Sequence, residues 1–327
     1  MNDRALRVLE QYDLEIISTR RGRGAYILET SQGLRIFCDY EGSERRAQFQ
    51  NCVMDRMRSG GYENVDMILP NKEGNLVSND WDDQKYVVKD WYPGRECDPS
   101  NESEIFTAVR NLAKIHRVMH AKGECEFIES FTAPDPLAEI MARNTELRKV
   151  RTFIRKKNDK CEFERLLQNS FPMYFEQAME VQKQLEENNC ERLVQGAKEN
   201  GTVCHGDYDQ HHVLLAGQET ATTGFDHCRY GLQMNDLYRF IRKILEKHEW
   251  NPRLGMRMLD QYTQIRSISG EERRLFYLKM LYPEKFRKLA NYYLESNKAW
   301  ISRRFLDKLE QQNKQQEQRE AFVKLLR

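Results

Sequence analysis

The pattern of hydrophobic and polar positions changes character near residue 95. Before that point the apolar runs are short and strand-like: one at 14–18, a hairpin pair at 19–40 and two more at 67–94. A stretch with helical spacing, 43–61, stands between the hairpin and the last two strands, and Ser43 is its expected N-cap. This part of the chain therefore predicts a small twisted sheet with one helix across it.

Beyond residue 95 the apolar side chains recur at helical spacing, as at 104–120 and 283–296. In 236–250 the apolar face consists of Leu237, Phe240, Ile241, Ile244 and Leu245. Short strands at 203–228 interrupt the helices. Residues 310–320 contain no apolar side chain, so we expect a solvated helix or a loose segment there.

This order of elements predicts an α+β fold of two lobes, as in protein kinases. A β-rich N-terminal lobe is expected at 1–92 and a helical C-terminal lobe at 93–327, with the hairpin 203–228 inserted in the second. The hinge is expected at 89–95, and the bend at Gly22–Gly24 is expected above the cleft. A nucleotide would lie between such lobes.

Composition narrows the classes of function. The formal net charge of the 327 residues is +1, so no overall field favours nucleic acid or a membrane surface. No apolar run approaches the ~20 residues of a membrane span, and the first residues lack the pattern of a secretion signal. We therefore expect a cytosolic protein, with its eight cysteines as reduced thiols.

The stretch "VCHGDYDQHHVLL" at 203–215 has the form of a phosphotransferase catalytic loop. In such loops an aspartate orients the acceptor hydroxyl, and an asparagine five residues later helps to hold magnesium. Here Asp207 stands at the aspartate position, after His205. His212 stands at the asparagine position, and imidazole is a poor ligand for a hard cation such as Mg²⁺.

The other nucleotide positions also depart from the phosphotransferase pattern. In "TGFDHCRYG", Gly224 replaces the aspartate that would bind magnesium, and Asp226 could reach the site only after a local bend. Cys38 stands where the phosphate-binding lysine is expected. The helix that should supply a glutamate offers Gln48 and Gln50. These losses argue against Mg-ATP chemistry, so no cofactor is expected unless an altered site binds ATP and Mg²⁺.

The chain resembles the CotS family of spore coat proteins, in the form found in clostridia. The resemblance rests on "VCHGDYDQHHVLL", "TGFDHCRYG", "NDLYRFIRKILEKHEW" and "YPEKFRKLANYYLESNKAWIS" and covers nearly the whole chain. It implies a fold like that of aminoglycoside and choline phosphotransferases. It also implies synthesis in the mother-cell cytoplasm, deposition in the spore coat and other coat proteins as partners. Asp236 matches an aspartate that supports the catalytic loop.

Three functions remain open on the sequence. The favoured one is a kinase-like coat scaffold or docking protein without activity, in which Asp207 and His205 only brace their loop. The alternatives are an active small-molecule or protein kinase with an altered metal site, and a module that binds a nucleotide or other ligand without turnover. No usual zinc spacing occurs among His211, His212, His227 and Cys228, so no metal site is expected.

Overall fold

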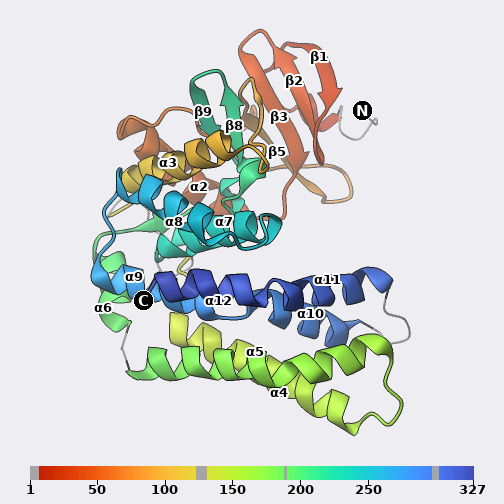
Figure 1. Cartoon of the computed structure of the whole chain (residues 1–327). Coiled ribbons are helices and arrows are strands. Elements are labelled where there is room, and N and C mark those ends of the chain that lie inside the picture. Colours follow the sequence, from red (N-terminus) through yellow and green to blue (C-terminus); the bar gives the residue numbers. More distant parts are fainter. Residues whose placement is uncertain (1–6, 123–130, 188–189, 297–301) are drawn as a thin grey trace. The chain divides into compact units, whose positions relative to one another are not determined.

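The computed structural model describes residues 7–122, 131–187, 190–296 and 302–327 (Figure 1). By their contacts the residues group into two compact units. The first contains Met1–Thr132, Ala197–Phe240 and Gln264–Arg266, and the second contains Ala133–Gly196, Ile241–Thr263 and Ser267–Arg327. The lobe boundary expected at residue 92 stays a prediction, since a contact unit and a kinase lobe are different divisions of a chain.

The first unit contains an antiparallel sheet in the order β1-β2-β3-β5-β4. Its strands are β1 (Ile16–Arg21), β2 (Ala25–Thr30), β3 (Gly33–Asp39), β4 (Ser78–Asn79) and β5 (Lys85–Asp90). Because successive strand residues face opposite sides, Val88 packs with Val8 and Leu28 on one face. On the other face Val87 packs with Ala47 of α2 (Glu44–Ser59), so the predicted helix across the sheet is confirmed.

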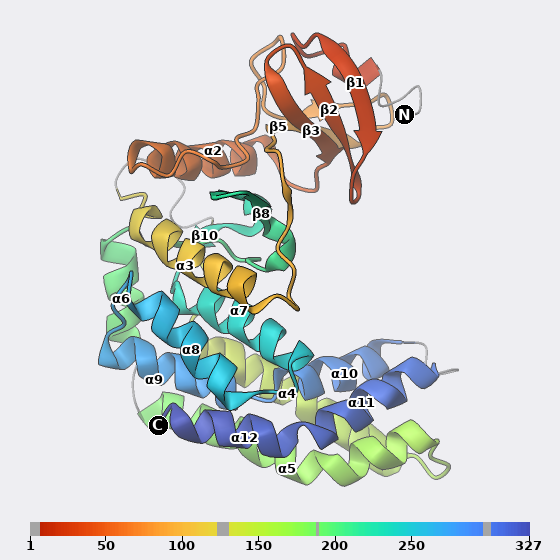
Figure 2. The same ribbon diagram turned by 45° about the horizontal axis from the view of Figure 1, so that its top comes forward.

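Helix α2 begins as its sequence predicts. The Ser43 side chain accepts a hydrogen bond from the backbone N–H of Arg46 and so caps a free donor of the first turn. The rest of the first unit comprises α3 (Glu102–Val118), the strands β6 (Arg95–Glu96), β7 (Val203–Cys204), β8 (Val213–Ala216), β9 (Glu219–Thr222) and β10 (Arg229–Tyr230), and the short helices η1 (Gln210–His212) and η2 (Phe225–His227). Strands β6, β8 and β9 form one small sheet and β7 and β10 another. Figure 2 labels one strand of each, β8 and β10.

The second unit is helical. It contains α4 (Pro136–Lys156), α5 (Glu162–Glu187), α8 (Pro252–Thr263), α9 (Gly270–Leu281), α10 (Glu284–Glu295), α11 (Arg303–Lys314) and α12 (Gln316–Leu325). Helices α4 and α5 lie side by side in both views (Figures 1 and 2). Helix α6 (Glu191–Glu199) and helix α7 (Met234–Lys247) each have residues in both units.

The polar segment 310–320 departs from its sequence-based expectation. It is ordered as the end of α11 and the start of α12, and Gln312, Gln316 and Arg319 are buried. Arg319 donates to the backbone carbonyls of Met280, at 2.8 Å, and Leu281 at the end of α9. Helix ends leave such carbonyls without partners, so a buried guanidinium can replace an apolar side chain here.

We expect Arg319→Met to lower the free energy of unfolding by about 1–3 kcal/mol, because two buried carbonyls lose their donor. Urea unfolding measures the change. The control is Arg303→Met, since the Arg303 side chain is 66% exposed and pairs only at the surface with Glu162 and Asp307; its effect should stay within about 0.5 kcal/mol. Equal effects of the two substitutions would contradict a capping role for Arg319.

Six of the described cysteines are free thiols: Cys38, Cys97, Cys161, Cys190, Cys204 and Cys228. Cys52, on α2, is disulfide-bonded, so the expectation of a reduced thiol is wrong for this residue. None of the helices in the described ranges combines the length and the apolar character that a bilayer crossing requires.

Candidate functional site

The backbone of the loop around Asp207 is held by Asp236, at the start of α7. The Asp236 carboxylate accepts from the N–H groups of His205, at 2.7 Å, and Gly206, at 2.9 Å. His116 Nε2 lies 3.2 Å from the same carboxylate. Burial opposes ionisation, but the bonds from His116 and Gly206 outweigh it and lower the pKa of Asp236. Asp236 thus supports the loop as the resemblance implies.

His205 is part of this scaffold. Its Nε2 lies 2.9 Å from the carbonyl oxygen of Thr223, and its Nδ1 lies 3.2 Å from the backbone nitrogen of Asp207. Since the amide must donate, Nδ1 is the acceptor and Nε2 carries the proton. Burial lowers the pKa of His205 to about 4. The imidazole is therefore neutral, and both of its ring nitrogens are hydrogen-bonded to the backbone. Neither nitrogen is free for proton transfer.

The carboxylate of Asp207 is bound by an arginine. Arg239 follows Asp236 by one helical turn on α7, and its guanidinium donates to Asp207 Oδ1. Both side chains are partly exposed. A carboxylate that takes a proton from an acceptor hydroxyl must be free to reach it. In this arrangement Asp207 would first have to leave Arg239.

His212 and Gly224 lie against each other. Gly224 has a φ of 79°, and a Cβ added to it would lie 2.2 Å from Cδ2 of the His212 ring. The imidazole therefore occupies the space that a side chain at position 224 would need. The two expected magnesium positions thus hold a poor ligand and a residue with no side chain, and they do not fit Mg²⁺. Within the described ranges, no group of three or more His, Cys, Asp or Glu side chains could hold a metal ion.

A lysine that the sequence placed only at the start of the expected hinge lies at the centre of the site. Lys89, on β5, is 4% exposed. Its Nζ lies 2.7 Å from Asp226 Oδ1 and 3.5 Å from Asp66 Oδ2. Cys38 on β3 pairs with Val87, two residues before Lys89 on the neighbouring strand. Burial raises the pKa of the Cys38 thiol to about 11, so the charge at this place comes from Lys89 instead.

The three charged groups have unequal pKa shifts. Burial opposes the charge of Lys89, but the attraction of Asp226 and Asp66 outweighs it and raises the pKa. Burial also opposes the charge of Asp226, yet Lys89 lowers the pKa of this carboxyl to about 2. For Asp66 burial dominates and raises the pKa to about 6. The closest pair, Lys89 and Asp226, is thus held in its charged form.

Asp226 reaches Lys89 because the chain bends at Gly224. The left-handed backbone of Gly224 leads directly into η2, which contains Asp226. Helix α2 holds this turn: Arg46 donates to the carbonyl oxygen of Asp226 from Nε, at 3.0 Å, and from Nη2, at 2.7 Å. Gln50 Nε2 lies 3.3 Å from Asp226 Oδ1. Gln50 therefore takes the place of a helix glutamate, but it contacts the aspartate rather than a lysine.

Comparisons with known proteins decide the family. The family model described as "Spore coat putative kinase YutH" matches residues 6–326. This chain belongs to the YutH family. The resemblance to spore coat proteins of the CotS type is thereby confirmed. Among curated proteins, no match was found.

Solved structures similar to this YutH-family chain include phosphotransferases. An aminoglycoside phosphotransferase from Alicyclobacillus acidocaldarius has a TM-score of 0.85 at 18% identity, over 98% of this chain and 94% of that one. A spectinomycin phosphotransferase in complex with ADP and spectinomycin has a TM-score of 0.60 at 10% identity, over 96% and 92%. The GDP complex of wild-type aminoglycoside 2'-phosphotransferase-IIIa has a TM-score of 0.56 at 13% identity, over 97% and 99%. The predicted α+β kinase-like fold is confirmed.

The bend between β1 and β2 contacts the loop that follows Asp207. Arg23 lies in this bend, between Gly22 and Gly24, and its guanidinium contacts Nδ1 of His211. The same guanidinium lies 3.5 Å from Glu96 Oε2, and Glu96 also contacts His211. The bend thus lies next to the loop, as expected for the roof of a kinase-like cleft.

Sequence reasoning missed Asp66, Lys89 and Arg239 in this YutH-family chain. One signal was available for Lys89: it directly follows Val87 and Val88 in a strand that is buried at all three positions, and a buried lysine needs a counter-charge. Arg239 lies three residues after Asp236, on the same face of a helix. Asp66 lies outside any regular element, and no local pattern identifies it.

Proposed function

We propose that this YutH-family chain serves in the spore coat as a kinase-like scaffold or docking protein that does not transfer phosphoryl groups. Membership of a family described as spore coat kinases supports the location. The observation that carries the proposal is the pairing of its two surviving carboxylates with cations of the chain itself: Asp226 with Lys89 and Asp207 with Arg239. The chain would be made in the mother cell and would then join other coat proteins.

Phosphoryl transfer requires carboxylates that are not paired with cations of the chain itself. Carboxylate oxygens must bind the magnesium that neutralises the phosphates, and another carboxylate must be free for the acceptor hydroxyl. Here Lys89 neutralises Asp226, and the His212 ring lies where a ligand from position 224 would be. The single charge of the Lys89 ammonium does not replace a divalent cation that coordinates phosphate and carboxylate oxygens together. A scaffold that transfers no phosphoryl group needs neither ATP nor a metal, so we propose that this chain uses no cofactor.

An active phosphotransferase with an altered metal site is the second candidate. One observation favours it: the loop is still held as a working loop would be, with Asp236 bonded to the amides of His205 and Gly206. These hydrogen bonds to the loop are retained although the residues at the expected magnesium positions no longer fit the metal. The two candidates differ in whether Asp207 acts chemically, and this difference can be measured.

The biochemical test uses the purified full chain with labelled ATP and either Mg²⁺ or Mn²⁺. We expect no transfer or hydrolysis above that of Asp207→Asn, because the base is bound by Arg239 and the metal positions do not fit. We also expect no thermal shift with millimolar ATP. A ligand at 100 times its dissociation constant would stabilise by ~2.7 kcal/mol, which is easily detected. Metal-dependent transfer that Asp207→Asn abolishes would establish the second candidate.

The cellular test expresses Asp207→Asn in a spore-forming bacterium that lacks the native copy. We expect a normal protein level, normal recovery in coat extracts and normal spore resistance, since asparagine keeps the size and one acceptor oxygen. Asp159→Asn, an exposed change in the second unit, sets the baseline. Loss of resistance with normal level and deposition for Asp207→Asn alone would refute the scaffold proposal.

A further inference from the structure

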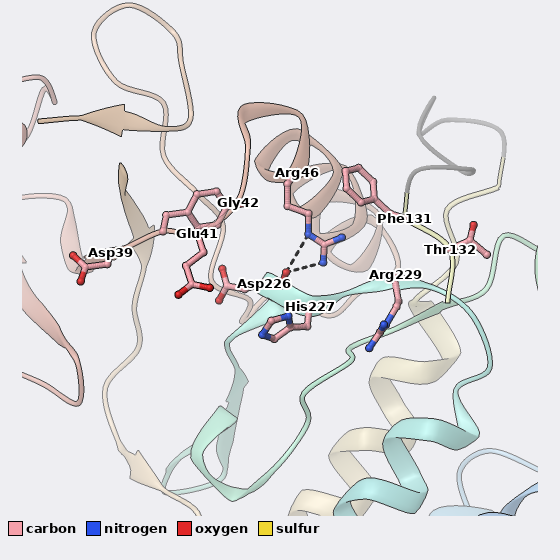
Figure 3. Close-up of a pocket in the computed structure, with 10 residues that line it drawn as sticks. Asp39, Glu41, Gly42, Arg46, Phe131, Thr132, Asp226, His227 and Arg229 are labelled. Atoms are coloured by element: carbon pink, nitrogen blue, oxygen red, sulfur yellow. Dashed lines mark hydrogen bonds between the residues drawn. The ribbon is translucent and has the colours of Figure 1, made fainter. Parts of the chain in front are cut away.

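A pocket of about 610 Å³ lies beside Asp226 (Figure 3). It belongs wholly to the first unit. Its walls come from the end of β3, the start of α2, η2 and β10, and from the residues before α4. The lining residues are Asp39, Tyr40, Glu41, Gly42, Arg46, Phe131, Thr132, Asp226, His227 and Arg229. The volume falls within the range of sites for small organic ligands.

The walls of this pocket are fixed by packing. Arg46 bonds to the carbonyl oxygens of Asp226 and Cys228, and its guanidinium carbon lies 4.8 Å from the centre of the Phe131 ring. Opposite, a Cβ added to Gly42 would lie 2.5 Å from the Tyr40 ring, so the chain turns closely over a buried tyrosine. A site with such walls need not be ordered by its ligand, which lowers the cost of binding.

The pocket carries charges of both signs. Asp39 and Glu41 are exposed, and within the described part of the chain their carboxylates make no hydrogen bond or ion pair. Asp226 joins them, since 39% of its side chain remains exposed despite its bond to Lys89. Arg229 and His227 line the same cavity, and Figure 3 shows Arg229 on the opposite side of Asp226 from Glu41 and Asp39.

We propose that this pocket binds a small zwitterion, with its ammonium group against Glu41, Asp39 and Asp226 and its anionic group against Arg229. Charge-assisted hydrogen bonds are the strong ones, and a concave site excludes part of the screening water. A ligand with only one charge would leave the opposite wall without a partner. This inference does not require phosphoryl transfer: of the pocket residues, only Asp226 and Arg46, which holds its turn, belong to the candidate active site.

The test uses ω-amino acids of increasing length: glycine, γ-aminobutyrate and ε-aminocaproate. Binding to the full chain is measured by calorimetry and by saturation-transfer NMR. n-Hexylamine and hexanoate serve as matched ligands with one charge each. We expect at least one amino acid to bind about tenfold more tightly than either of them, a difference of about 1.4 kcal/mol. The proposal is wrong if no amino acid binds more tightly than the singly charged ligands.

Two variants locate the binding. Glu41→Gln should remove the preference for the amino acid over hexanoate, and Arg229→Gln should remove the preference over n-hexylamine. Glu15→Gln and Arg20→Gln make the same changes of charge at exposed positions outside the pocket and should bind as the native chain does. Urea unfolding checks that all four variants are folded. Equal affinities across the four would place the binding elsewhere and overturn the assignment.

Discussion

Lys89→Met is expected to lower the free energy of unfolding by about 3–5 kcal/mol, because it removes one partner of a buried ionic cluster. Lys89 Nζ lies 2.7 Å from Asp226 and 3.5 Å from Asp66, and only Asp226 retains substantial exposure. Methionine fills a similar volume, so the loss is electrostatic and not a cavity effect. Equilibrium unfolding in urea at neutral pH measures it.

This loss should depend on pH with a definite sign. The folded-state pKa of Asp66 is raised to about 6, so this carboxyl is charged above that pH and takes up a proton below it. The attraction between Asp66 and Lys89 therefore exists at about pH 7.5 and is largely absent at about pH 5. Asp226, with a pKa lowered to about 2, stays charged at both pH values. The deficit of Lys89→Met should be smaller at the lower pH.

Matched variants separate the cluster from a general effect of losing a lysine. Lys183→Met removes a lysine that is 67% exposed and 3.8 Å from Glu187, and it should change stability by less than about 1 kcal/mol. Adding Asp226→Asn to Lys89→Met should recover part of the loss, because the uncompensated carboxylate is then gone. Additive losses in the double variant would mean that Lys89 contributes by packing alone.

Much of the fold could be predicted because its elements follow local periodicity. The face of 236–250 is an example: Leu237, Phe240, Ile241, Ile244 and Leu245 are all buried in α7. The segment 310–320 could not be placed in the same way. Its burial depends on carbonyls at the end of α9, which are distant in sequence and supply partners for Arg319. Periodicity detects apolar faces but not polar side chains that are buried with their partners.

In the candidate site, too, the local motif could be predicted and the contacts between distant residues could not. His205 and Asp207 were found from a short motif and Asp236 from the resemblance to spore coat proteins, and the structure brings the three together. The cation beside Asp226 could not be found in this way, because Lys89 comes from a different strand from the one where the sequence analysis sought it. Cys38 stands where the phosphate-binding lysine was expected. Only the antiparallel register of β3 and β5 shows that the positive charge comes from the neighbouring strand.

The contact between His212 and Gly224 leads to the second large effect. Gly224→Asp should lower the free energy of unfolding by about 2–5 kcal/mol, as overpacking adds to the strain of a left-handed residue. The new Cβ would lie 2.2 Å from the His212 ring, at a φ of 79°. Gly61→Asp is the matched control: Gly61 has a φ of 88° and nothing within 4 Å of its Cβ position. The loss of stability in Gly61→Asp should therefore arise from the backbone strain alone.

Combining Gly224→Asp with His212→Asn should cost less than the sum of the two single substitutions, since asparagine vacates the space that the ring occupies. The expected difference is about 1–3 kcal/mol, the part of the loss that arises from overpacking. The backbone strain should remain, so the double variant should resemble Gly61→Asp in stability. Urea unfolding of the four proteins of the cycle measures this. Strict additivity would show that the ring can move aside freely, and the spatial argument against a metal ligand at position 224 would then fail.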